Sequence, residues 1–318
     1  MHTEEVHFYS EGCRLSGVLK VPAAGAPPWP IIVHGPGWLE TVGHPFGISF
    51  HEGLVDAGYA VLQFDYRGWG ESEGEPGWAK PSMQQVDILN AITYVSCRHD
   101  LDIDRLGLFA YGGPGPGNAI YAASRDTRVK AICCQSVIAD GRTWLREIRR
   151  GYEWIELQHQ IEENRRLRVL KNEEIFVDPS EGITVASPGR KLRSDLPRPT
   201  IPFHLASVED IFQFQPIDVV GRLSPCGVLL CAVANDPVTA EHHARALYEN
   251  ARPPRRLIVQ HNIDHYASYT VNRDFLVSQF VDWYDHHLQS SVRDISPGNL
   301  RDEIIEYSRP SRPDKEKS

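Results

Sequence analysis

Short apolar runs alternate with segments whose apolar residues recur every three to four positions. The runs Tyr59–Phe64 and Val129–Cys134 contain almost no charged residue, which is typical of parallel strands buried on both faces. Between them, Ser82–Cys97 has helical spacing, with Val86, Leu89, Ile92 and Val95 on one face. The alternation predicts an α/β fold with a mostly parallel sheet and helices on both of its faces.

The same alternation extends over most of the chain. At the N-terminus, Val6–Tyr9 and Leu15–Val21 flank Glu11-Gly12 and predict a hairpin. Further strands and helices are expected in the order strand Pro30–Val33, helix Gly47–Ala57, strand Arg105–Ala110, helix Asn118–Ser124, strand Gly227–Val233, helix Thr239–Asn250, strand Arg256–Gln260 and helix Asn272–Leu288.

One interval interrupts this rhythm and divides the chain. We predict a core formed by residues 1–140 and 217–290, with residues 141–216 inserted as a helical cap. The first part of the insert, Trp144–Asn172, is expected to form a charged helix pair, and its second part is rich in proline and serine. Residues 291–318 form a polar tail, and Arg309–Ser318 is expected to be disordered.

Charge and composition narrow the choice of partner. The 318 residues carry a formal net charge of -9, which disfavours nucleic acid and anionic membranes as partners. The chain has no run of 18 apolar residues and no signal peptide at its N-terminus, so we expect a cytoplasmic protein. The expected partner is a small-molecule substrate, and a homodimer is an open alternative.

The cysteines and histidines give no metal-binding pattern. None of the six cysteines forms a CxxC pair, so we interpret them as reduced residues, mostly in the core. The adjacent pairs His242-His243 and His286-His287 are interpreted as surface residues, because neighbours on a helix point in different directions. No GxGxxG motif follows a strand and opens a helix. We therefore expect neither a metal nor a cofactor.

Four segments, in a fixed order, carry a family resemblance. They are the loop Asp65–Ser72, the strand Arg105–Phe109, the pair Asn235-Asp236 and the pair Asp264-His265. Together they resemble the α/β-hydrolase superfamily, in particular its dienelactone-hydrolase-like and acyl-peptidase-like branches and the acyl transferases of polyketide biosynthesis. The resemblance covers roughly residues 5–290 and implies the α/β-hydrolase fold.

The resemblance exposes a departure at the nucleophile elbow, the sharp strand-to-helix turn that carries the catalytic serine in this superfamily. With Ala110 at the first small position of the motif, Gly112 takes the place of the serine. Between Leu101 and Ala123 there is no Ser, Cys or Thr. The sequence therefore excludes covalent catalysis by a residue of this turn.

The other two members of a catalytic triad are present. Asp236 follows one late strand and His265 follows the next, which is where the fold places the acid and the base. We predict that the Asp236 carboxylate fixes the tautomer of the His265 imidazole and that His265 faces Gly112. The alternative is that both are exposed loop residues.

A glycine-containing loop after the first long strand is the candidate oxyanion site. The segment His34-Gly35-Pro36-Gly37-Trp38 matches the histidine–glycine loop of the superfamily, and Gly113 follows the nucleophile position. Glycines allow backbone N–H groups to approach a substrate oxygen, although Pro36 removes one donor. The alternative is a tight turn with no electrostatic role.

Three further residues are candidates either for contact with the substrate or for the role of the missing nucleophile. Tyr111 precedes Gly112 and either donates a hydrogen bond in the pocket or only packs. Ser136 and Cys134 end the next strand at the same edge of the sheet, and either is a conceivable substitute nucleophile, although we favour neither.

Two functions follow from these residues. In the first, His265 acts as a general acid/base on a small apolar substrate, with a polyketide or other natural product as the best analogy. Hydrolysis, lyase, isomerase and cyclase chemistry are all compatible with that role. In the second, the chain is a ligand-binding protein that has lost catalysis. We favour the enzyme, because a chain freed from catalysis has no need of both Asp236 and His265.

Overall fold

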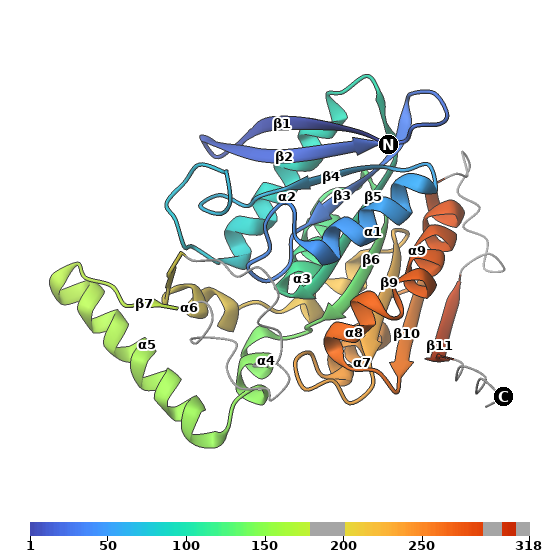
Figure 1. Cartoon of the computed structure of the whole chain (residues 1–318). Helices are drawn as coiled ribbons and strands as arrows, with labels where there is room; N and C mark the ends of the chain where they lie inside the picture. Colours follow the sequence, from blue (N-terminus) through green and yellow to red (C-terminus); the bar gives the residue numbers. More distant parts are fainter. Residues whose placement is uncertain (179–200, 289–300, 310–318) are drawn as a thin grey trace, which may run out of the picture.

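The computed structural model describes residues 1–178, 201–288 and 301–309, and within them nine strands form one mostly parallel sheet (Figure 1). Their order across the sheet is β1-β2-β4-β3-β5-β6-β9-β10-β11, and only the pairs β1–β2 and β2–β4 are antiparallel. The strands are β1 (His2–Ser10), β2 (Cys13–Val21), β3 (Trp29–Gly35), β4 (Ala60–Phe64), β5 (Leu101–Gly113), β6 (Val129–Val137), β9 (Gly227–Val233), β10 (Arg255–His261) and β11 (Asp302–Ser308). This is the predicted α/β-hydrolase architecture.

Helices cover both faces of this sheet. One face packs against α1 and α9, with the short α8 beside them, and the other packs against α2, α3 and α7 (Figure 1). The helices of the core are α1 (Pro45–Asp56), α2 (Pro81–Ser96), α3 (Pro114–Arg125), α7 (Glu241–Asn250), α8 (His265–Thr270) and α9 (Arg273–Leu288). The central strands are sequestered on both faces, which explains why they appear in the sequence as continuous apolar runs.

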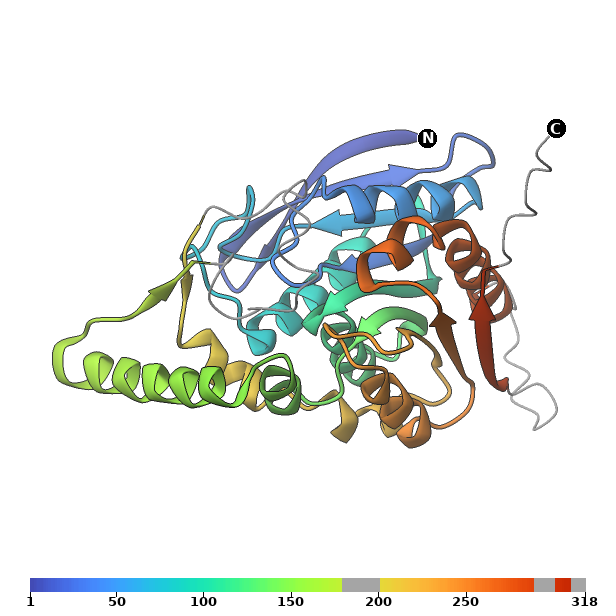
Figure 2. The ribbon, with the colours of Figure 1, turned by 60° about the horizontal axis from the view of Figure 1, so that its bottom comes forward.

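The insert forms an extension at one end of the molecule. Helix α5 (Gly151–Lys171) stands away from the sheet, as both ribbon views show (Figures 1 and 2). It is connected to the body by α4 (Gly141–Glu147) on one side and, on the other, by β7 (Phe176–Val177), β8 (Phe203–His204) and α6 (Ser207–Phe212). The short 3-10 helices η1 (Pro216–Asp218) and η2 (Val220–Arg222) then lead back to β9.

The predicted helix pair of the insert is present, but its apolar residues do not all form a core. Trp144 is buried, whereas Tyr152 and Ile155 are exposed. Helix α5 buries only Leu157, Ile161 and Asn164, because it packs against little else along its length. Helical spacing predicted the helix, but it did not predict how many of its apolar side chains are buried.

The C-terminal tail is a correction to the predicted boundary of the core. Residues 302–308 form β11, which pairs in parallel with β10 at the edge of the sheet. Ion pairs between strands hold it there: Arg255 binds Asp302, and Arg256 binds Glu303. The segment looked polar in the sequence because an edge strand that is half exposed needs few apolar residues. Most of the segment expected to be disordered, residues 310–318, lies outside the described residues.

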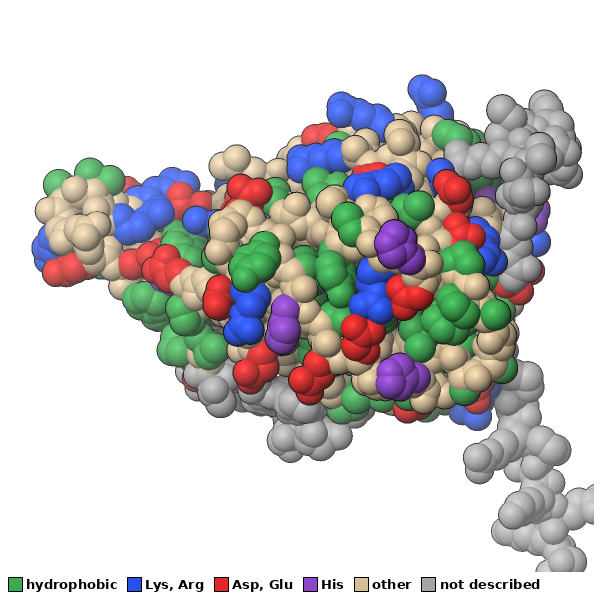
Figure 3. All heavy atoms as spheres, turned by 90° about the horizontal axis from the view of Figure 1, so that it is seen from above, with side chains coloured by type: hydrophobic (Ala, Val, Ile, Leu, Met, Phe, Trp, Pro, Cys, Tyr) green, Lys and Arg blue, Asp and Glu red, His purple; other side chains and the backbone are tan. Residues whose placement is uncertain are grey.

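The face of the molecule at the top of Figure 1 carries acidic and basic side chains side by side, and among its described residues no extended area has a single sign (Figure 3). Among the described helices, none has both the length and the apolar character needed to cross a bilayer.

Candidate active site

Two loops at the carboxyl edge of the sheet bring Asp236 and His265 into contact. His265 Nδ1 lies 2.7 Å from Asp236 Oδ2, and the two residues are only 7% and 5% exposed. Asp236 is itself held by the backbone N–H groups of Val238 and Thr239 and by the Thr239 hydroxyl. The structure therefore places the predicted acid and base in a buried hydrogen-bonded pair.

The electrostatics of this pair favour an ionised carboxylate. Burial alone would raise the pKa of Asp236, but the charge and hydrogen bond of His265 and the two backbone N–H donors lower that pKa below its ordinary value. An ionised Asp236 accepts the Nδ1–H of His265, which leaves Nε2 as the basic nitrogen of the neutral ring. The imidazole is thus oriented and its tautomer is fixed, as acid/base chemistry requires.

Side-chain hydrogen bonds hold helix α8, which begins at His265. The Asp264 side chain caps it by accepting the backbone N–H of Ala267 at 2.8 Å. The Ser268 hydroxyl donates to the His265 carbonyl oxygen at 2.9 Å, and Gln135 of β6 donates to that hydroxyl at 2.7 Å. The Gln135–Ser268 contact was missed in the sequence because it joins distant segments. Tyr269 was missed because no helix was expected over His265–Thr270.

The Tyr269 hydroxyl contacts Nε2, the other ring nitrogen of His265. This hydroxyl lies 3.3 Å from His265 Nε2, one helical turn beyond the histidine. Nε2 is the atom that faces the serine hydroxyl in a Ser-His-Asp triad. A tyrosine hydroxyl therefore makes the contact that a serine makes in such a triad.

Strand β5 ends, where the chain turns into α3, on two successive glycines with positive φ. Gly112 has φ +76°, and Gly113, at the start of α3, has φ +60° and ψ −121°. A Cβ added at Gly112 would meet no atom within 4 Å, whereas at Gly113 it would lie 3.5 Å from Trp38 and 3.9 Å from Trp144. The position predicted for the nucleophile therefore borders open space and carries no side chain.

Aromatic side chains gather beside this turn. Trp38 packs edge-on against Trp144 of α4, with ring centroids 6.1 Å apart, and against Phe203 at 6.0 Å. The indole N–H of Trp144 donates to the Val238 carbonyl oxygen at 2.8 Å, which connects the insert to the Asp236 loop. The insert thus supplies an apolar wall next to Gly113, and Phe203 is a residue that the sequence analysis missed.

Two backbone N–H groups of the expected oxyanion loop donate hydrogen bonds to other groups of the protein. The N–H of Gly37 donates to Glu40 at 2.7 Å, and the N–H of Trp38 donates to the Gly112 carbonyl oxygen at 3.2 Å. A Cβ on Gly35 would lie 3.0 Å from Ile88, so this glycine permits close packing of α2. In this structure, the loop fixes the turn at Gly112 and does not direct these two N–H groups at a ligand.

The remaining predicted residues of this region form a buried polar cluster around Glu40. The Tyr111 hydroxyl donates to Glu40 at 2.6 Å and Gln63 donates to it at 3.3 Å, while His34 Nε2 lies 3.5 Å from the other carboxyl oxygen. Tyr111 and His34 are therefore core residues, 5% and 0% exposed. The second His34 nitrogen contacts His51 at 2.8 Å.

Burial dominates the protonation of this cluster. It raises the pKa of Glu40 to about 8, against the opposing effect of hydrogen bonds from Tyr111, Gly37 and Gln63. It also lowers the pKa of His34 to about 3. At neutral pH we therefore expect a protonated Glu40 beside a neutral His34.

Both candidates for a substitute nucleophile are buried. Cys134 is 0% exposed, and burial raises the pKa of its thiol, which disfavours the thiolate that a nucleophile requires. Ser136 is 1% exposed and has φ +57°, a conformation uncommon for a serine. Its side chain lies near Tyr269, where it opposes the rise in the pKa of the phenol.

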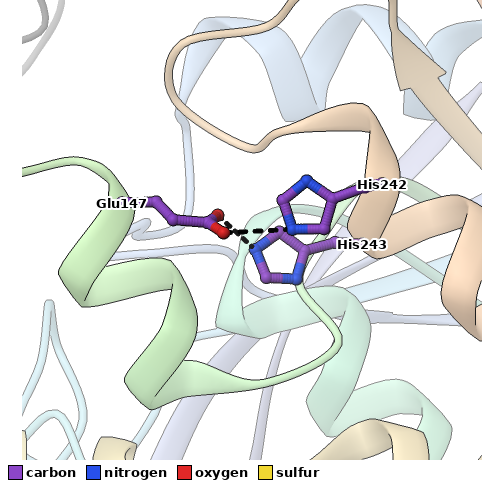
Figure 4. A group of neighbouring side chains, drawn as sticks. All are labelled: Glu147, His242 and His243. Carbon is purple, nitrogen blue, oxygen red and sulfur yellow. Dashed lines mark ion pairs between the residues drawn. The ribbon is translucent and has the colours of Figure 1, made fainter.

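One cluster in the described residues has the residue types of a metal site. Glu147, His242 and His243 bring their ligand atoms within 4.8 Å of one another, between α4 and α7 (Figure 4). His243 is 2% exposed, so its interpretation as a surface residue was wrong; helix α4 of the insert covers it. Its Nδ1 accepts the backbone N–H of Ala139 at 3.2 Å, so in the neutral ring Nε2 carries the proton and points towards Glu147. The cluster suits a contact between insert and core better than a metal ion.

A family model covers most of the core and the whole of the insert. Residues 11–267 match the model of the X-Pro dipeptidyl-peptidase (S15) family. The chain belongs to this family. The match includes the turn at Gly112 and both members of the Asp236–His265 pair.

Relatives of known sequence share less than a third of their residues with this S15-family chain. An uncharacterized 31.7 kDa protein in the traX-finO intergenic region of Escherichia coli is 28% identical over 89% of this chain and 98% of its own length. The thiohydrolase aneE of Aspergillus aculeatus is 32% identical, but over only 40% of this chain and 39% of its own length. The quorum-quenching protein AidA of Acinetobacter baumannii is 31% identical over 43% of this chain and 44% of its own.

Solved structures show the same fold. The α/β hydrolase GrgF from a Penicillium species superposes with a TM-score of 0.78 at 16% identity, covering 91% of this chain and 100% of GrgF. A hypothetical protein of Pseudomonas aeruginosa gives 0.78 at 18% identity, covering 90% and 94%. These likenesses bear out the α/β-hydrolase fold expected from the sequence.

Proposed function

We propose that this S15-family chain is a hydrolase in which His265, oriented by Asp236, acts as a general acid/base without an acyl-enzyme intermediate. The observation that carries the proposal is the buried 2.7 Å contact between these residues, combined with a turn at Gly112 that has no hydroxyl or thiol. The pair is held on the Asp236 side by three further hydrogen bonds. Such anchoring is what a proton-transferring histidine needs.

The chemistry of this proposal is attack by water on an acyl carbon. The water gives up its proton towards His265 as its oxygen bonds to the carbonyl carbon, and the imidazolium is stabilised by Asp236. The proton then passes to the leaving group as the bond to the carbonyl carbon breaks. Because Gly112 presents no side chain and borders open space, the reacting carbonyl has room where a serine would otherwise stand.

The substrate class that we favour is an apolar acyl thioester, such as a polyketide-like intermediate. Two observations support it: the aromatic wall of Trp38, Trp144 and Phe203 beside Gly113, and the partial likeness to a thiohydrolase. The formal net charge of -9 disfavours nucleic acid or an anionic membrane as partner, and we place the enzyme in the cytoplasm.

The test is hydrolysis of a panel of N-acetylcysteamine thioesters with short, branched and aromatic acyl groups. Turnover is measured as the release of free thiol. We expect His265→Ala to lower turnover about 100-fold or more with folding unchanged. His159→Ala, an exposed histidine on α5, serves as the matched control and should leave turnover unchanged. Wild-type turnover in His265→Ala would refute the proposal. Binding of thioesters without turnover by the wild type would instead indicate a ligand-binding protein.

A further inference from the structure

The basic nitrogen of His265 already has a partner. Asp236 takes the Nδ1–H, so Nε2 is an acceptor, and the Tyr269 hydroxyl at 3.3 Å is positioned to donate to it. A substrate or water that gives its proton to His265 must either displace this phenol or pass the proton through it.

Packing holds the phenol in place. The Tyr269 ring stacks on Phe46, with centroids 5.0 Å apart, and lies 5.3 Å from the Tyr111 ring. It also meets the His265 ring edge-on at 5.3 Å, and only 2% of Tyr269 is exposed. A ring enclosed on these sides cannot swing away without disturbing the core between α1 and β5. Displacement is therefore costly, and passage of the proton through the phenol is the easier route.

The hydroxyl is suited to pass a proton but not to lose one permanently. Burial raises the pKa of Tyr269 well above its ordinary value, so the phenol stays protonated at neutral pH. The buried Ser136 side chain lies near the same hydroxyl and opposes this rise, so the surroundings of the oxygen are partly polar. Ser136 also has φ +57°, and such conformations cluster at functional sites.

We propose that Tyr269 is a further catalytic residue, the group through which His265 exchanges its proton with the reacting water. This inference rests on the proposed function. As the water attacks, its proton bonds to the Tyr269 oxygen while the phenolic proton moves to His265 Nε2, leaving a neutral tyrosine and an imidazolium paired with Asp236. The two transfers reverse when the leaving group takes its proton. No charge remains on the phenol at either stage.

The variant that tests the relay is Tyr269→Phe, because it removes only the hydroxyl. Tyr266→Phe is the matched control: it lies on the same helix, and its ring also packs edge-on against His265, at 4.9 Å. With a turned-over thioester, we expect Tyr269→Phe to lower kcat about tenfold or more and to leave KM within about twofold. Tyr266→Phe should change neither. Equal kcat values for the two variants would overturn the relay.

A second measurement needs no substrate. In protein labelled with ¹⁵N-histidine, loss of a hydrogen bond to Nε2 moves that resonance to higher frequency. We expect this change in Tyr269→Phe and not in Tyr266→Phe. An unmoved Nε2 resonance in Tyr269→Phe would contradict the hydrogen bond on which the relay depends. The two proposals fail differently: full turnover in His265→Ala refutes the function, whereas an inactive His265→Ala with an unaffected Tyr269→Phe refutes only the relay.

Discussion

At the turn from β5 into α3, Gly112 is the residue that bears most directly on the proposed chemistry. Its φ of +76° is accessible to glycine without steric cost, and an added Cβ would contact nothing within 4 Å. A serine placed here would therefore fit the available space, at a backbone strain of about 1–3 kcal/mol.

We predict that Gly112→Ser folds, with a modest fall in Tm, and that its natural turnover decreases because the new hydroxyl occupies the space of the reacting atom. Weak cleavage of activated esters such as p-nitrophenyl acetate is expected to appear, since the Asp236–His265 pair is intact. Thermal unfolding and parallel assays of both substrates measure this. Unchanged natural turnover alongside new esterase activity would place the chemistry away from Gly112.

Glu40 makes the stability of the protein depend on pH. Its pKa in the folded state is raised to about 8, whereas the unfolded chain releases the proton near the ordinary value of 4.5. Folding therefore binds a proton between these values, so the contribution of Glu40 to stability falls as pH rises from about 4.5 and levels off above about 8.

Glu40→Gln removes this ionisation. We predict that its Tm relative to wild type increases steadily from pH 5 to pH 8, by an amount equivalent to at most a few kcal/mol. Glu162→Gln, on the exposed side of α5, is the control and should show no such trend. A difference between Glu40→Gln and wild type that is constant over this pH range would show that Glu40 is ionised in the folded protein.

Among the elements, the edge strand β11 is held by contacts with both its neighbouring helix and its neighbouring strand. Tyr307 stacks on Phe275 of α9 with ring centroids 3.5 Å apart, and Glu303 pairs with the nearly buried Arg256. Removing the strand would expose Phe275 and leave Arg256 with fewer partners.

A chain that stops after residue 300 should therefore lose roughly 2–4 kcal/mol of unfolding free energy, from apolar area and hydrogen bonds together. Urea denaturation measures this loss. The control chain stops after Arg309 and keeps β11; it should match the full-length protein. Equal stability of all three chains would mean that β11 does not hold the sheet edge.

The sequence predicted most of these elements, for identifiable reasons. The buried parallel strands were visible as apolar runs, since strands covered on both faces leave no polar periodicity. The edge strand β11 was missed because its pattern alternates between exposed and half-buried residues and lacks a long apolar stretch. The small number of buried residues on α5 was not predicted, because helical periodicity does not show whether another element packs against the apolar face of a helix.

At the scale of the whole molecule, the site combines segments that are far apart in the chain. Asp236, His265 and Gly112 could be predicted because each lies at the carboxyl end of a strand in a known type of sheet. Glu40 and Phe203 could not, because they reach the site by tertiary contacts that leave no local motif. Tyr269 could not, because its position beside His265 depends on helix α8, which the sequence pattern did not indicate. His243 was misplaced for the same reason: helix α4 of the insert covers it.

The burial of Ser136 and the absence of a hydroxyl at Gly112 also predict how the protein reacts with serine-directed reagents. Serine-directed fluorophosphonates should not label it, since the turn at Gly112 offers no hydroxyl and Ser136 is 1% exposed. Intact-protein mass spectrometry after incubation, with peptide mapping, checks this. Stoichiometric labelling at Ser136 would identify a relocated nucleophile.

We propose that catalysis proceeds through His265 and Asp236 with no covalent intermediate. The most direct test is the intact mass of the enzyme, acid-quenched at intervals during turnover of a slow aromatic thioester while the free thiol is counted in the same samples. We expect thiol to accumulate over many turnovers while the protein mass stays that of the unmodified chain. A transient species heavier by the acyl group, mapped to a residue of this chain, would contradict it.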